Sequence, residues 1–89
     1  MTVSHGMNIE EVRHLGQQLQ QQAQHLSDLL SQLEGQINNT TWMGPDATTF
    51  KTQWWPQHRG QLQSAADGLR DFGQSALNNA TEQENVSSL

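Results

Sequence analysis

Residues 9–37 read IEEVRHLGQQLQQQAQHLSDLLSQLEGQI, and this stretch decides the fold class. Its apolar residues follow one another in steps of three or four, the spacing of one face of an α-helix. They are Ile9, Val12, Leu15, Leu19, Ala23, Leu26, Leu29, Leu33 and Ile37. The glutamines between them are good helix formers and fall on the solvent side in the same helical phase. The pattern therefore predicts one long amphipathic helix.

Both ends of this helix are marked in the sequence. Asn8 is a predicted N-cap, and Glu11 lies three residues later, where its side chain can reach back to the cap. Glu10 and Glu11 place negative charge at the positive end of the helix dipole. The run 38–41 consists of Asn and Thr, which favour turns over helix interiors. We therefore predict a helix over residues 8–38 and a turn over residues 39–44.

A second helix is predicted over residues 45–82. Pro45 suits the first helical turn, where its missing N–H needs no partner. Apolar residues then recur in steps of three or four, at Ala47, Phe50, Trp54, His58, Leu62, Ala65, Leu69, Phe72, Ala76 and Ala80. Pro56 removes one backbone hydrogen bond and meets the carbonyl of Thr52. Because the stripe keeps its phase across Pro56, we expect a kink there, and beyond about Gln83 we expect a frayed tail.

These elements predict an all-α fold for residues 1–89, a single antiparallel helix-turn-helix hairpin. In a lone hairpin each helix has one neighbour, so much of the apolar stripe stays in water. We therefore expect two hairpins to dimerise into a four-helix bundle. The residues predicted at that dimer interface are Val12, Leu15, Leu19, Leu26, Leu30, Leu33, Leu62 and Leu69.

Composition argues against several function classes. The chain has 89 residues, a net charge of −5 and four Lys and Arg that are scattered, whereas a nucleic-acid binder carries a basic stripe. It contains no cysteine, which excludes disulfides and thiol chemistry. Residues 1–8 do not form an ordinary signal peptide. No apolar run approaches the roughly 20 residues that span a bilayer, so stable membrane insertion is not expected.

Candidate catalytic and metal-binding groups are few. Glu11 and His14 form a Glu-x-x-His pair, but di-iron bundles need two such pairs and two further Glu, and capping already explains Glu11. His58 lies on the apolar stripe, where a half-buried packing role is favoured. No Gly-x-Ser-x-Gly elbow or phosphate-binding loop is present. The sequence therefore predicts neither an enzyme nor a bound metal or cofactor.

The neighbours Trp54 and Trp55 point about 100° apart on a helix. We expect Trp54 to pack in the seam and Trp55 to be the more exposed. Because exposed aromatic side chains concentrate at interfaces, Trp55 is a candidate partner contact.

The predicted turn carries the tripeptide Trp42-Met43-Gly44 between two amphipathic helices of similar length. With it, the chain resembles the WXG family of small Esx-type, early-secretory-antigen-like proteins exported by type VII secretion in Gram-positive bacteria. The resemblance extends from Ile9 to about Val86. Pro45-Asp46-Ala47, then Phe50 and Trp54, is similar to a pattern common in actinobacterial members, and residues 79–83 are similar to their helix ending.

The resemblance implies a non-enzymatic secreted protein that acts by protein–protein binding, as a homodimer or with a paralogous partner. Trp42 and Gly44 would form the hairpin tip and half of a composite export element. The family's Tyr-x-x-x-Asp or Glu signal is absent, since the chain contains no Tyr. Export would then depend on a partner's signal or on a degenerate one. The alternative is an intracellular structural or adaptor coiled-coil hairpin in which the Trp-x-Gly tripeptide is coincidental.

Overall fold

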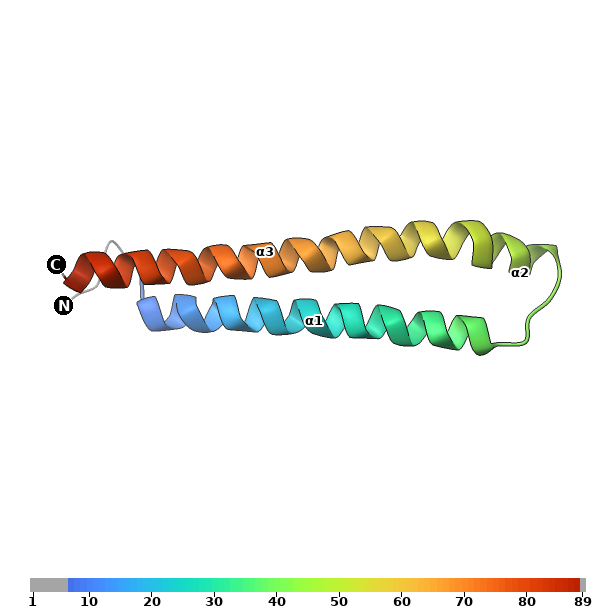
Figure 1. The fold of residues 1–89 in the computed structure, drawn as a ribbon, viewed down its shortest axis with the longest axis horizontal. Helices are drawn as coiled ribbons and strands as arrows, with labels where there is room; N and C mark the ends of the chain where they lie inside the picture. The colour runs from blue at the N-terminus through green and yellow to red at the C-terminus, as the bar shows by residue number, and fades with distance from the viewer. Residues whose placement is uncertain (1–6, 89) are drawn as a thin grey trace.

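The computed structural model describes residues 7–88, which form a thin helical hairpin. One arm is α1, Ile9–Asn39, and the other arm contains α2, Pro45–Thr49, a π-helical turn η1, Phe50–Trp54, and α3, Trp55–Ser88. The two arms run antiparallel side by side, with the turn at one end and the start of α1 and the end of α3 at the other (Figure 1). The molecule measures 66 × 17 × 15 Å. The predicted all-α hairpin is confirmed, whereas the four-helix bundle stays a prediction.

The first helix begins and ends as its sequence predicts, to within one residue. The Asn8 side chain accepts a hydrogen bond of 3.1 Å from the Glu11 N–H, which satisfies one of the free donors of the first turn. At the other end, the Thr40 N–H donates to the Ile37 carbonyl at 3.3 Å. The Thr40 hydroxyl donates to the Gln36 carbonyl at 2.6 Å. Threonine thus closes the helix with its backbone and its side chain.

The turn depends on Gly44. Its φ of 111° lies in a region that residues with a Cβ rarely adopt, so the glycine is what lets the chain reverse. Pro45 follows at the first position of α2, as predicted. Lys51 ties the turn to the second arm, because its ammonium donates to the carbonyls of Thr40 and Trp42 at 3.4 and 3.5 Å.

A π-helical turn precedes Pro56, where a kink was expected. The Trp55 N–H donates to the carbonyl of Phe50, five residues earlier, instead of four. Pro56 has no N–H to donate to the Thr52 carbonyl. The wider π-helical turn accommodates this missing hydrogen bond, so the helix continues past Pro56. The Thr52 hydroxyl donates to the Thr48 carbonyl at 2.6 Å in the same stretch.

The expected fraying after Gln83 is wrong, because α3 continues to Ser88. The end of α3 lies beside the start of α1, where Glu84 forms an ion pair of 3.1 Å with Arg13. Ala80, one turn earlier, is completely buried. Packing between the arms therefore supports a segment whose own sequence is weakly helical.

Small residues line the seam between the arms. The buried residues of α1 recur every seven positions, and so does one set on α3: Gly16, Ala23 and Leu30, facing Ala66, Gly73 and Ala80. A Cβ built on Gly16 would lie 2.8 Å from the Gly73 carbonyl oxygen, and one built on Gly73 would lie 2.7 Å from the Gly16 carbonyl oxygen. The two backbones therefore touch at this crossing, with no room for a side chain between them.

Candidate binding surfaces

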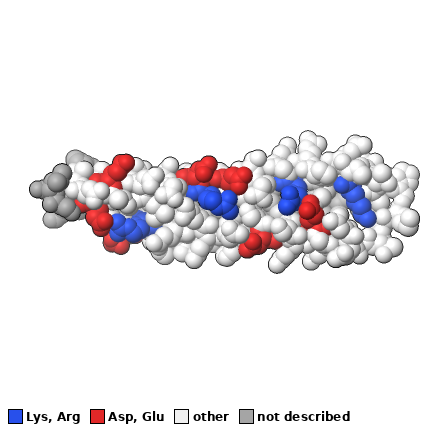
Figure 2. All heavy atoms as spheres, in the orientation of Figure 1, with Lys and Arg blue, Asp and Glu red and all other residues white. Residues whose placement is uncertain are grey.

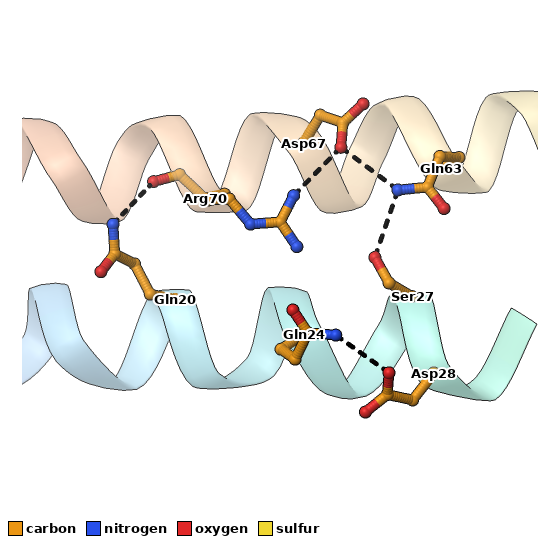
Figure 3. Close-up of polar contacts among 7 residues, drawn as sticks. All are labelled: Gln20, Gln24, Ser27, Asp28, Gln63, Asp67 and Arg70. Carbon is orange, nitrogen blue, oxygen red and sulfur yellow. Dashed lines mark hydrogen bonds and ion pairs between the residues drawn. The ribbon is translucent and has the colours of Figure 1, made fainter.

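Polar side chains connect the two arms along one side of the seam, which we name the polar flank. Gln20 of α1 donates to the Arg70 carbonyl at 3.5 Å and to the Gln74 side chain at 3.2 Å. Further along, Gln63 donates to the Ser27 hydroxyl and to Asp67, both at 3.2 Å (Figure 3). Arg70 closes the network through an ion pair with Asp67 at 3.2 Å. These contacts fix the register of α1 against α3.

Ion pairs extend the polar flank to both ends of the hairpin. Arg13 bridges Glu10 on its own helix and Glu84 on α3. Toward the turn, one carboxylate oxygen of Glu34 is 3.1 Å from Arg59 Nε and accepts from the Trp55 indole at 3.3 Å. Charged side chains of both signs accordingly lie along the length of the molecule (Figure 2). Burial lowers the pKa of Arg13, but the two carboxylates beside it outweigh that effect and raise the pKa above its ordinary value.

The opposite side of the seam carries most of the large apolar side chains, and we name it the apolar flank. Successive residues of an α-helix lie about 100° apart around its axis. Residues on the opposite side of the buried seam residues from the polar contacts therefore fall on the apolar flank. The apolar flank consists of Leu15, Leu19, Leu26, Leu29 and Leu33 of α1 and Leu62, Leu69 and Phe72 of α3. Phe72 is 64% exposed and Leu29 is 48% exposed. The side of the hairpin with the fewest polar contacts between its arms is therefore the side with the most exposed apolar surface.

Six of the eight residues predicted at the dimer interface lie on this flank: Leu15, Leu19, Leu26, Leu33, Leu62 and Leu69. Val12 is half-buried near the seam. Leu30 is only 1% exposed, so it belongs to the hairpin's own seam and not to a surface that a partner would meet. Leu29 and Phe72 belong to the apolar stripes of the sequence but are not among the residues predicted at the interface. Both are among the most exposed residues of the apolar flank.

A row of aromatic rings runs from the turn onto the second arm. Ring centroids are 5.3 Å apart for Trp42 and Phe50, 5.0 Å for Phe50 and Trp54, and 4.2 Å for Trp54 and His58. Phe50 and Trp54 are nearly parallel, with 19° between their planes. The row extends the exposed apolar surface onto the tip of the hairpin. His58 packs against Trp54, in line with its predicted packing role.

A shallow, largely open cavity of about 410 Å³ lies against these rings. It is lined by Trp42, Asp46, Thr49, Phe50 and Trp54. The sequence points to Trp42 at this tip, but not to Asp46 or Thr49 as parts of a site. Asp46 lies four residues before Phe50 and Thr49 lies five residues before Trp54, a spacing that matches no recognisable binding motif.

The assignment of the two neighbouring tryptophans is reversed in the structure. Trp55, the candidate partner contact, is 8% exposed and is held in the seam by Glu34. Trp54, expected in the seam, is 50% exposed. The π-helical turn explains the exchange, because one extra residue in a turn sets every later residue back by about 100°.

The remaining chemistry of the described residues is sparse. Across residues 7–88 no group of three or more His, Cys, Asp or Glu is placed to hold a metal ion. His14 and His25 are both exposed on α1. None of the helices described is both long enough and apolar enough to cross a membrane.

Comparisons with known proteins identify no relative. No family model, no curated protein and no solved structure matches the chain.

Proposed function

We propose that this chain is a non-enzymatic binding protein of the type VII secretion kind, which acts as one half of a homo- or heterodimeric helical bundle. The observation that carries the proposal is the separation of the two flanks. Hydrogen bonds and ion pairs hold the arms together on the polar flank, while Leu15, Leu29 and Phe72 remain exposed on the other. Contiguous exposed apolar surface of this kind is typical of a protein–protein interface.

Dimerisation through the apolar flank would complete the core that the hairpin begins. Fully burying an exposed large apolar side chain contributes about 1.5–3 kcal/mol. Four of the eight flank residues are exposed in the hairpin, and the other four are half-buried. A second hairpin would cover this flank on both arms at once, because the two antiparallel arms lie side by side along their length. Because small residues fill the seam, the two arms of a hairpin pack closely together. The leucines then lie beside the seam, where a second hairpin can contact them.

The turn supports the secretion part of the proposal. The resemblance to the WXG family depends on Trp42 and Gly44, and in the structure both lie at the reversal between the arms, with Trp42 partly exposed. An exposed Trp at the tip is available to an export machine while the apolar flank is occupied by a partner. Because the chain has no Tyr for the family's export signal, we propose that a paralogous partner supplies that signal.

Solution mass measured by light scattering tests the binding part, for the chain alone and mixed with the product of the neighbouring gene. We expect the mass of a dimer in one of the two samples. Phe72→Gln should shift the equilibrium toward monomer, whereas Ser75→Gln, which places the same residue on an exposed polar position of the same helix, should not. A monomer in both samples contradicts the proposal.

Culture filtrate tests the secretion part and separates it from the alternative of an intracellular adaptor hairpin. We expect the chain in the filtrate, with a cytosolic control protein absent, only when the partner is co-expressed. A dimer that never leaves the cell would favour the adaptor. Secretion that persists without any partner would remove the proposed dependence on a partner's signal.

A further inference from the structure

The cavity at the tip has a chemical character that the apolar flank lacks. It is lined by three aromatic residues, Trp42, Phe50 and Trp54, together with Asp46 and Thr49. The faces of aromatic rings attract cations through their quadrupole, and tryptophan does so most strongly. A carboxylate beside such faces adds a full negative charge.

The carboxylate of Asp46 is available to a ligand. Within the described residues no ion pair or side-chain hydrogen bond engages it, and no cation lines the cavity. The one lysine of the sequence, Lys51, donates to the carbonyls of Thr40 and Trp42. The three arginines are paired with Glu10, Glu84, Glu34 and Asp67. Within residues 7–88, no Lys or Arg side chain is therefore placed to fill this site.

We propose that the tip cavity binds the guanidinium group of an arginine in a basic peptide segment of another protein. The planar guanidinium stacks on an indole face and at the same time pairs with a carboxylate, and both partners are present here. An ammonium group would be attracted less, because it is a compact charge that cannot stack. The net charge of −5 favours the approach of a basic segment.

This inference does not depend on the proposed function, because it requires neither a dimer nor export. The five residues that line the cavity are not among the eight residues of the apolar flank. The site would give the hairpin a second contact surface, distinct in chemistry from the first.

The three indole groups allow a direct test by NMR, since each indole N–H gives its own signal. The probe is a capped Gly-Arg-Gly peptide titrated into the isotope-labelled full chain. We expect the indole signals of Trp42 and Trp54 to shift with saturation, while that of Trp55, which is buried against Glu34, stays in place. Equal shifts of all three signals, or no saturation, would overturn the proposal.

Three further titrations separate charge recognition from simple apolar contact. A capped Gly-citrulline-Gly peptide has the same shape as the probe without its charge, and we expect it to bind at least about threefold more weakly. A capped Gly-Lys-Gly peptide should bind between the two. If citrulline or a capped Gly-Leu-Gly peptide binds as tightly as the arginine peptide, the cavity is an apolar groove and the proposal fails.

A pair of isosteric variants locates the charge. Asp46→Asn should weaken arginine binding by about two- to fivefold, the range of an exposed ion pair. Asp71→Asn removes the same charge from an exposed position on α3 outside the cavity and should leave the affinity unchanged. Equal weakening by both variants would show attraction to net charge alone and would overturn the site. Helix content measured by circular dichroism verifies that both variants remain folded.

Discussion

The seam and the apolar flank use apolar residues in opposite ways. Gly16, Ala23, Ala66 and Gly73 are buried in the seam, whereas Phe72 and several leucines lie exposed beside it. A hairpin that had to be stable by burial alone would place its largest side chains between its arms. This one brings the backbones into contact and places much of its hydrocarbon outside. The difference indicates that intimate packing holds the arms together and that the larger residues are available for another molecule.

The sharpest test of this difference uses two neighbouring leucines. Leu30 is 1% exposed and Leu29 is 48% exposed, although they have the same side chain and the same helix around them. We expect Leu30→Ala to lower the free energy of unfolding by about 2–4 kcal/mol, because it leaves a cavity in the seam. Leu29→Ala should cost less than about 1 kcal/mol in the monomer. Urea unfolding at a concentration where light scattering shows monomer measures both, and similar losses would contradict the assignment of Leu30 to the seam.

A second pair of substitutions tests the contact between backbones. Gly73→Ala should destabilise the hairpin by about 1–2 kcal/mol, because its Cβ would lie 2.7 Å from the Gly16 carbonyl oxygen, which cannot move without separating the arms. Gly68→Ala has open space around it and should stabilise by about 0.5–1 kcal/mol through helix propensity. Thermal unfolding should therefore give opposite signs for the same substitution five residues apart. A gain in both variants would mean that the arms are not in contact at this point.

Much of the fold could be predicted because it follows from local rules. The period of the α1 leucines, the cap at Asn8 and the glycine at the turn each act through neighbouring residues, and each was found at its expected place. The use of glycine in the seam was not predicted. Propensity treats Gly73 as a weak helix former, and only the opposing Gly16 explains why it is there.

The errors at the tip have a different origin. A π-helical turn leaves no clear periodic signal in the sequence, yet it changes the direction of every later side chain. For this reason the exposed and buried tryptophans were exchanged, and the cavity formed by Trp42, Phe50 and Trp54 could not be assembled from their spacing. Only the proline at position 56 indicated that the helix would be irregular there.

A moderate effect is expected at the edge of the seam. Glu34 accepts from the Trp55 indole and pairs with Arg59, so Glu34→Ala leaves a buried indole N–H and a cation without their partner. We expect a loss of about 1 kcal/mol, within the range for a hydrogen bond and a partly exposed ion pair. Glu82→Ala, at an exposed position of α3, is the control and should change stability by less than about 0.5 kcal/mol. Equal losses would show that the polar flank contributes little to joining the arms.

The smallest effect on the stability of the hairpin is expected from substitutions on the apolar flank. They differ from seam substitutions in how the melting temperature depends on protein concentration. Leu15→Gln should change the unfolding free energy of the monomer by less than about 0.5 kcal/mol, because Leu15 is already exposed. If the flank binds a second hairpin, the wild-type melting temperature should rise with protein concentration, since association stabilises the folded state by mass action. Leu15→Gln should reduce that rise while leaving the dilute limit unchanged. A seam variant such as Leu30→Ala should instead lower the melting temperature at every concentration, and a Leu15→Gln variant that behaved in that way would place Leu15 in the core of the monomer.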